Sequence, residues 1–104
     1  MDGCRRPFGC QALCKPDYDC VVTGTLTPDC TGGYFEHGTF DGKPLYRKDN
    51  SSWYIYWDEY EAGWVIQQEY GSVESDYWVR HYPNPFGEYE PGEPGFGTAT
   101  VTGV

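Results

Sequence analysis

The stretch Trp53-Tyr54-Ile55-Tyr56-Trp57 decides the fold, together with Trp64-Val65-Ile66, which follows it after a short acidic turn. Successive side chains of a β-strand face opposite sides, so the two tryptophans and Ile55 share one face and the two tyrosines share the other. The pattern predicts a central β-hairpin with aromatic side chains on both faces. We expect the face of Trp53, Ile55 and Trp57 to form the core. The face of Tyr54 and Tyr56 is expected to meet a partner subunit, the loop 86–96 or a sugar.

Aromatic residues replace aliphatic ones in this chain. Its 104 residues suffice for one domain. They include seven Val, three Leu and two Ile, against ten Tyr, five Phe and four Trp. Each aromatic side chain can bury about 150–250 Å², and Tyr and Trp also carry a polar atom that needs a partner when it is buried. The composition therefore predicts a small core built largely from rings.

The net charge of −9 argues against one class of partner. Nucleic-acid binding needs clustered Lys and Arg, and the seven in this sequence are scattered, so we expect no nucleic-acid partner. The acidity has two explanations, solubility and cation binding by carboxylate loops. No run of the sequence approaches the ~20 apolar residues of a membrane span, so we expect no membrane partner either.

The N-terminal residues 1–7 include two Arg but are followed by no apolar run, unlike a secretory signal. Clustered cysteines nevertheless suggest an oxidising environment, because cytosolic proteins rarely keep disulfides. A protein that is assembled inside a cell and then released to an oxidising exterior would fit both observations. We therefore expect an extracellular or virion location without a recognisable signal peptide.

All five cysteines lie in the first third of the chain, mostly in a segment with few apolar residues. Three explanations compete. Disulfides would cross-link such a segment. A zinc or iron–sulfur site would suit clustered thiolates, although the Cys-x2-Cys spacing typical of zinc sites is missing. The odd count leaves at least one thiol free or intermolecular. We expect no other cofactor. The disulfide or metal candidates are Cys4, Cys10, Cys14, Cys20 and Cys30.

Short strands separated by polar turns follow the cysteines. Asp41-Gly42 is a strong hairpin signal, and nowhere does a helical apolar period persist for about 10–12 residues. The segment 83–97 is expected to be an irregular loop, held over the sheet by its aromatic residues, because prolines cannot donate ladder hydrogen bonds. Strands are expected at residues 21–27, 34–37, 44–47, 53–57, 64–68, 77–82 and 98–104.

The expected fold is all-β, a small antiparallel meander sheet or a partly open barrel of about 5–7 short strands. Turns of about four to six residues are too short for helical crossovers. The Thr-rich strands at 21–27 and 98–104 would lie side by side to close the sheet. The chain divides into an N-terminal cysteine-rich arm, residues 1–20, and an aromatic-rich β domain, residues 21–104.

No catalytic signature stands out, and we expect that the protein is not an enzyme. The two histidines, His37 and His81, lie on different expected strands. Carboxylates for glycoside hydrolysis could come from the acidic turn 58–61, but acidic residues are ordinary in turns. The sequence contains no nucleophile elbow, phosphate loop or calcium-loop pattern.

Aromatic rings beside carboxylates and amides are elements from which sugar-binding surfaces are commonly built, and Tyr and Trp are also enriched in protein interfaces. The same rings would instead form the core if they are buried, because aliphatic residues are scarce. Both explanations stand at the level of the sequence. The binding or interface candidates are Tyr54, Tyr56, Tyr60, Trp64 and Trp78.

Six runs of the β domain form a set: Gly33-Tyr34, the segment 38–46 with its Asp-Gly turn, Trp53–Trp57, Trp64–Ile66, Tyr77-Trp78 and Gly97–Val101. Together they resemble a small aromatic β module that recurs, often near chain ends, in uncharacterised proteins of bacteria, bacteriophages and some marine eukaryotes. The resemblance covers residues 21–102 and implies a display or attachment module more than an enzyme. The cysteine-rich arm lies outside it.

These observations predict a non-enzymatic structural or accessory protein of an extracellular assembly or virus particle, such as a decoration, tail or filament component. The cysteine-rich arm would anchor it to other protein subunits, in a homo-oligomer or a hetero-oligomer, and the β domain would be displayed. The alternative is a carbohydrate-binding module that contacts surface glycans through exposed Tyr and Trp side chains.

Overall fold

The computed structural model describes residues 18–49, 51–68, 77–92 and 95–104, so most of the cysteine-rich arm lies outside the described residues. Within these ranges the chain forms strands and turns and no helix, in agreement with the sequence-based prediction. The strands are β1 (Cys20–Thr23), β2 (Gly32–Phe40), β3 (Lys43–Lys48), β4 (Tyr54–Asp58), β5 (Gly63–Gln67), β6 (Trp78–Arg80), β7 (Gly87–Pro91) and β8 (Ala99–Gly103).

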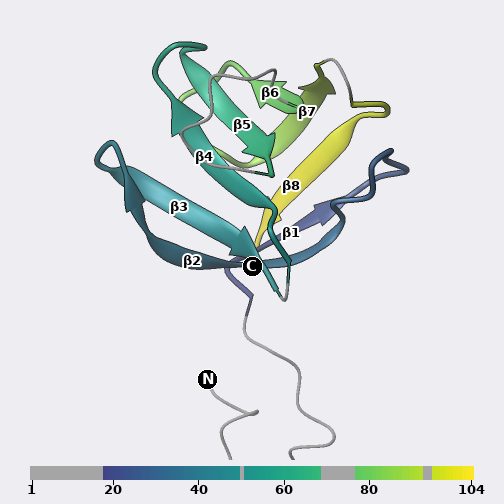
Figure 1. Ribbon diagram of the computed structural model, residues 1–104, viewed down its shortest axis with the longest axis horizontal. Coiled ribbons are helices and arrows are strands. Elements are labelled where there is room, and N and C mark those ends of the chain that lie inside the picture. Colours follow the sequence, from purple (N-terminus) through teal and green to yellow (C-terminus); the bar gives the residue numbers. More distant parts are fainter. Residues whose placement is uncertain (1–17, 50, 69–76, 93–94) are drawn as a thin grey trace, which may run out of the picture.

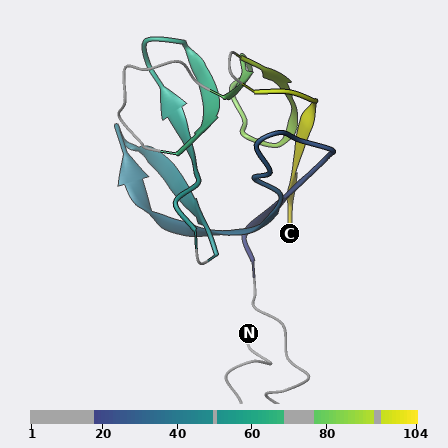
Figure 2. The same ribbon diagram turned by 45° about the vertical axis from the view of Figure 1, so that its right-hand side comes forward.

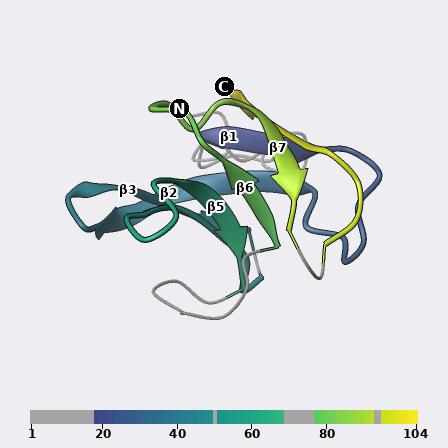
Figure 3. The same cartoon turned by 90° about the horizontal axis from the view of Figure 1, so that it is seen from above.

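Each strand pairs with the next in antiparallel fashion, and β8 pairs with β1 to close an eight-stranded barrel. Figure 1 shows β1, β2 and β3 along the lower side of this barrel and β5, β6 and β7 along the upper side, and Figure 3 gives the view from above. The predicted all-β antiparallel fold is confirmed. So is the closing contact between the Thr-rich strands, in which Val22 pairs with Val101 and Thr23 with Thr100. The barrel has one strand more than the largest number expected.

Strand β7 lies in the segment 83–97, which was predicted to be an irregular loop. That prediction was wrong, because the prolines stand at the edges of the strand: Pro85 precedes it, and Pro91 is its last residue. The central residue of β7, Tyr89, is fully buried in the barrel interior. The strand pairs with β6 on one side and β8 on the other, so it completes the closed barrel.

The β2–β3 hairpin turns at Asp41 and Gly42, whose φ angles are 53° and 79°. Positive φ at both central residues is the type I′ geometry that an Asp-Gly pair favours, so the hairpin signal is confirmed. The β3–β4 ladder is short and ends at the pair Tyr46–Ile55. The next hydrogen-bonded position on β3 is Pro44, which has no N–H to donate. The two hairpins diverge from that point, as Figures 1 and 2 show.

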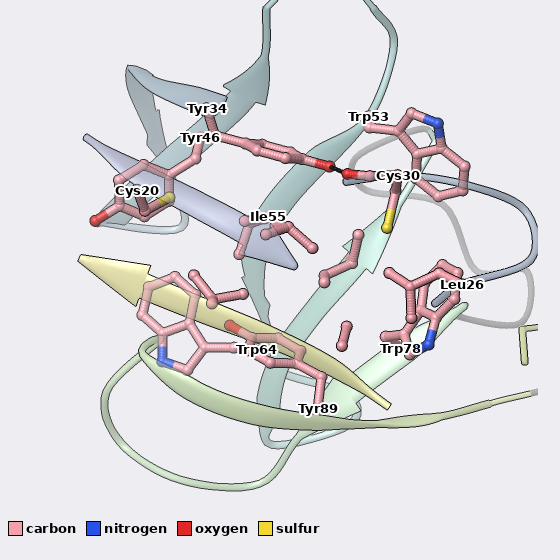
Figure 4. Close-up of a cluster of buried hydrophobic side chains, with 14 residues drawn as sticks. Cys20, Leu26, Cys30, Tyr34, Tyr46, Trp53, Ile55, Trp64, Trp78 and Tyr89 are labelled. Carbon is pink, nitrogen blue, oxygen red and sulfur yellow. Dashed lines mark hydrogen bonds between the residues drawn. The ribbon is translucent and has the colours of Figure 1, made fainter. Parts of the chain in front are cut away.

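Rings fill much of the barrel interior, as Figure 4 shows. An eight-stranded barrel is just wide enough for its own side chains to fill it. The face of Trp53, Ile55 and Trp57 points inward as predicted: the first two are buried, and Trp57 packs half-buried against them. Fully buried members of this interior cluster are Trp78, Tyr34, Tyr89, Ile55, Ile66, Val22, Val101, Ala99, Cys20 and Cys30.

Four of the buried rings attach loops to the barrel through their polar atoms. A buried polar atom without a partner costs about 1–3 kcal/mol, so each bond fixes both the ring and the loop that accepts it. The acceptors lie in the β1–β2, β6–β7 and β7–β8 loops. The bonds run from Tyr34 Oη to Cys30 O (2.7 Å), from Trp64 Nε1 to Pro83 O (3.0 Å), from Trp78 Nε1 to Gly97 O (2.9 Å) and from Tyr89 Oη to Pro85 O (2.7 Å).

A second apolar cluster lies on the outer face of β3, β4 and β5. Tyr56 on β4 is 1% exposed, and Leu45 and Val65 are similarly buried beside it. The ring of Phe40 meets that of Tyr56 edge-on, with 5.2 Å between the ring centroids. The second face of the central hairpin is therefore buried within this chain.

The expectation that the loop 86–96 covers this outer face is not met by its two phenylalanines. Phe86 lies next to Gly103 at the end of β8, because a Cβ at that glycine would be 3.4 Å from the Phe86 ring. Phe96 pairs with Thr27 in the β1–β2 loop. Both phenylalanines therefore lie beside the ends of β1 and β8.

Candidate functional site

The barrel interior is packed, and its titratable groups are neutral. Burial raises the pKa of the Cys20 thiol and that of the Cys30 thiol to about 12. Burial likewise raises the pKa values of Tyr34 and Tyr89 well above the ordinary range of a phenol. Nucleophilic attack and metal binding require the thiolate, which is scarce for such groups near neutral pH. The interior therefore supports the fold rather than chemistry.

Cys20 and Cys30 were candidates for a disulfide or metal site, and the structure shows them instead as free, buried thiols of the core. Their side chains point into the barrel, where Figure 4 shows the two sulfur atoms apart from one another. Among the residues that the structure describes, no group of His, Cys, Asp and Glu is arranged to hold a metal ion. The remaining candidates, Cys4, Cys10 and Cys14, lie outside the described ranges.

Three of the five aromatic binding candidates are core residues. The exposed fractions of Tyr56, Trp64 and Trp78 are 1%, 3% and 0%, so their rings have no face available for a ligand. Tyr54 is partly buried and packs against the outer cluster. Only Tyr60 of the five is open to solvent, with 95% of its surface exposed.

Tyr60 belongs to a surface that the β4–β5 and β6–β7 loops build together. Tyr60 and Glu61 are neighbours in the first loop, and His81 and Tyr82 are neighbours in the second. Glu61 Oε1 lies 3.6 Å from His81 Nε2, which brings the two loops into contact. The Tyr82 side chain is 60% exposed. We call Tyr60, Glu61, His81 and Tyr82 the loop platform: two exposed rings, each next in sequence to one member of the Glu61–His81 pair.

Hydrogen bonds within the β4–β5 loop fix the position of Tyr60. Asp58 Oδ1 accepts bonds from the backbone N–H of Tyr60 at 2.9 Å and from that of Glu61 at 3.4 Å, which forms an Asx-type turn. The carboxylate of Glu59 accepts a bond from Trp57 Nε1 at 3.0 Å. Asp58 and Glu59 therefore hold the loop. The ring of Tyr60 projects into solvent from a constrained backbone.

Arg80 fixes the second loop. Its Nε donates to Asn84 O at 3.0 Å, and its Nη2 donates to Asn84 Oδ1 at 3.3 Å. The guanidinium carbon lies 4.6 Å from the centroid of the Tyr82 ring, within cation–π range. Gly87 makes room for this arrangement, because a Cβ there would lie 2.5 Å from Arg80 Nη1. The Tyr82 ring thus packs against the Arg80 guanidinium, which hydrogen bonds to Asn84 hold in place.

The loop platform can stack against a ligand and exchange hydrogen bonds with it. The side chains of His81 and Glu61 are 60% and 38% exposed, so water screens their charges and leaves their polar atoms accessible. The other histidine, His37, lies on β2, across the closed barrel from β6. The two imidazoles are therefore not brought together.

Tyr82 is the platform residue that the sequence candidates missed. It was assigned to an expected strand, 77–82, whereas β6 ends at Arg80. Two prolines follow it, Pro83 and Pro85. Because prolines interrupt a strand ladder, they are the signal that could have placed Tyr82 in a loop.

Within the described residues, no helix has the length and apolar character that crossing a membrane requires. Comparison with known proteins yields no relative: no protein family matches the sequence, and neither a curated protein nor a solved structure shows significant similarity to it.

Proposed function

We propose that this protein is a non-enzymatic structural or accessory component of an extracellular assembly or virus particle. The cysteine-rich arm, residues 1–20, anchors it to neighbouring protein subunits. The barrel is displayed, and the loop platform is its contact surface.

The position of the loop platform relative to the start of the barrel is the observation that carries the proposal. In a closed barrel of eight consecutive strands, β1 lies across from β5 and β2 across from β6. The chain enters β1 at Asp19, whose N–H donates to Tyr34 O on β2 at 2.9 Å. Figure 1 shows β1 and the C-terminus on the lower side of the barrel and β5 and β6 on the upper side. Because neighbouring strands are antiparallel, the β4–β5 and β6–β7 loops lie at the same end of the barrel as the start of β1. A subunit held at its N-terminus therefore presents Tyr60 and Glu61 at this end of the barrel, on the side across from β1.

The packed interior supports the same proposal. Ligand-binding barrels of this size hold a small molecule inside, which needs an interior that side chains do not fill. Here Trp78, Tyr34 and Tyr89 lie across that space with exposed fractions of 0%. Any partner is therefore expected to bind at the outer surface.

The proposal is tested by the mass of the full chain in solution, measured by light scattering after size exclusion with and without reductant. We expect assemblies of several subunits in non-reducing buffer that become smaller when reductant is added. The triple variant Cys4→Ser, Cys10→Ser, Cys14→Ser should lose the reductant-sensitive species. A protein that stays monomeric in both buffers would overturn the proposal.

Cys30→Ala is the matched control. Cys30 is a buried thiol, so its removal should leave the reductant-sensitive assembly unchanged. If Cys30→Ala abolished the assembly while the triple variant kept it, the anchoring role of the cysteine-rich arm would be contradicted.

A further inference from the structure

We propose that the loop platform is a binding site for a neutral saccharide. The inference rests on the proposed function, since it names the ligand class of the displayed contact surface. Each sugar ring would lie against the face of a platform tyrosine, and its hydroxyl groups would bond to Glu61 and His81.

The two platform rings have the exposure that stacking requires. Tyr60 is 95% exposed and Tyr82 is 60% exposed, so each has an open face. Aromatic rings carry negative charge on their faces, which attracts the weakly positive C–H groups of a pyranose. The Tyr82 ring is pre-organised by its contact with Arg80, and Asp58 holds the backbone from which the Tyr60 ring projects. Pre-organised groups lose little conformational entropy on binding.

The polar groups beside the rings supply both kinds of hydrogen bond. The Glu61 carboxylate accepts hydrogen bonds, and the His81 imidazole donates at one nitrogen and accepts at the other when it is neutral. Their mutual distance of 3.6 Å is longer than a good hydrogen bond, so both retain capacity for a third partner. A sugar hydroxyl, which donates and accepts at once, can bond to both side chains.

Charge selects against an anionic ligand. Three carboxylates, those of Asp58, Glu59 and Glu61, lie in or next to the β4–β5 loop, and the chain carries a net charge of −9. Two described cations lie near these loops. Arg80 already donates to the Asn84 and Glu88 carbonyl oxygens and to the Asn84 side chain, and Lys43 Nζ lies 5.4 Å from the centroid of the Trp57 ring. Sulfated or uronic-acid-rich glycans would therefore be repelled, whereas a neutral sugar is not.

A proline-rich peptide is the competing ligand for exposed tyrosines. Such peptides bind in grooves lined by aromatic residues, where the walls bury the proline rings. Tyr60 forms no such wall, because 95% of its surface is open to solvent. An isolated ring on a loop suits the flat face of a pyranose better, and the observations favour the saccharide.

The test is a titration of the full chain with neutral oligosaccharides of glucose, mannose, galactose and N-acetylglucosamine, chosen from a glycan array. Trp57 reports binding through its fluorescence, because it is partly exposed and bonded to Glu59 in the platform loop. We expect saturable binding of at least one neutral oligosaccharide, weakened at least tenfold in Tyr60→Ala and in Tyr82→Ala. Glu61→Gln, which keeps the acceptor oxygen, should weaken it less than Glu61→Ala.

Phe96→Ala is the matched control, because Phe96 is another exposed ring, 70% exposed, in the β7–β8 loop at the opposite end of the barrel. The affinity of the Phe96→Ala variant for the oligosaccharide should equal that of the unchanged chain. The proposal would be overturned if Phe96→Ala weakened saccharide binding as much as Tyr60→Ala does. It would also be overturned if no neutral oligosaccharide bound, or if the protein preferred a proline-rich peptide or a sulfated glycan. Reductant-sensitive assembly without saccharide binding would refute this inference and leave the proposed function standing.

Discussion

The interior of the barrel and the loop platform use the same residue types for different purposes. Inside, Tyr34 and Trp78 are 0% exposed, and their polar atoms bond to carbonyl oxygens of the chain itself. On the loop platform, Tyr60 and Tyr82 are open to solvent, and bonds made by neighbouring residues hold the loops in position. The interior rings stabilise the fold by packing and hydrogen bonding within it, whereas the platform rings are held at the surface, where a ligand can reach them.

This difference teaches which rings a ligand can reach. Aliphatic residues are scarce in this chain, so aromatic residues supply both the core and the exposed surface. An inward-facing ring gains by burying roughly 150–250 Å². An exposed ring buries no surface when the chain folds, so it contributes free energy only when a partner covers it. Substitutions in the two regions should therefore separate folding from binding.

The largest expected effect is alkaline unfolding of the interior. Cys20 and Cys30 have an ordinary pKa of 9.0 and a pKa of about 12 in the fold, because burial disfavours the charged thiolate. Their neutral forms therefore stabilise the barrel fully below pH 9, and this contribution is lost as the pH rises from 9 to 12. Circular dichroism followed against pH should show cooperative unfolding in that window.

Thiolate absorbance provides the matching control in the variant Cys4→Ser, Cys10→Ser, Cys14→Ser. Only Cys20 and Cys30 remain in it, and we expect no thiolate signal until the barrel unfolds. Ionisation of either thiol near pH 8 in the folded protein would show that the interior is open to water.

Trp78→Ala should cause the next largest loss. Removing a fully buried indole leaves a cavity, and such substitutions typically cost about 3–5 kcal/mol in free energy of unfolding. The variant also leaves Gly97 O without the Trp78 Nε1 donor. Urea denaturation followed by circular dichroism measures the loss. A change below about 1 kcal/mol would contradict the assignment of Trp78 to the core.

Gly97→Ala tests how closely the β7–β8 loop approaches the β1–β2 loop. Gly97 has a φ of +91°, and a Cβ there would lie 2.3 Å from Thr25 O. Gly38 has a similar φ of +89° with no atom within 4 Å of its Cβ position. Strain at positive φ costs about 1–3 kcal/mol in either case. We expect Gly97→Ala to lower the free energy of unfolding by more than Gly38→Ala does, and equal losses would argue against the close approach.

The same chemical change in both regions gives a smaller contrast. Tyr34→Phe removes the hydroxyl that donates to Cys30 O at 2.7 Å and leaves a buried carbonyl unsatisfied, which costs about 1–3 kcal/mol. Tyr60→Phe removes a hydroxyl in solvent and should stay within about 0.5 kcal/mol. Thermal and urea unfolding of both variants measures this difference. Equal effects would remove the distinction between interior and platform rings.

The sequence predicts the fold well where side-chain alternation is strong. The alternation in Trp53–Trp57 identifies the core face, and the Asp41-Gly42 pair identifies the hairpin turn, because each is a local property of a few residues. Strand β7 was missed for the opposite reason. Its prolines suggested a loop, and only the contacts of Tyr89 in the closed barrel show that the segment between them is a strand.

The candidate site was less predictable from the sequence. Alternation cannot tell which aromatic rings the barrel buries, so Trp64 and Trp78 were nominated for binding although they are core residues. Tyr60 was nominated and is exposed. The contact between Glu61 and His81 joins two loops that are far apart in the chain, so no sequence pattern reveals it.

The smallest stability effect provides the most direct test of the account. The double variant Tyr60→Ala, Tyr82→Ala removes both platform rings and should change the free energy of unfolding, measured by urea denaturation, by no more than about 0.5 kcal/mol per substitution. That result would show that the platform rings are dispensable for folding and available for a partner. A loss of about 3 kcal/mol or more, comparable to that of a buried aromatic side chain, would contradict the division between the interior and the loop platform.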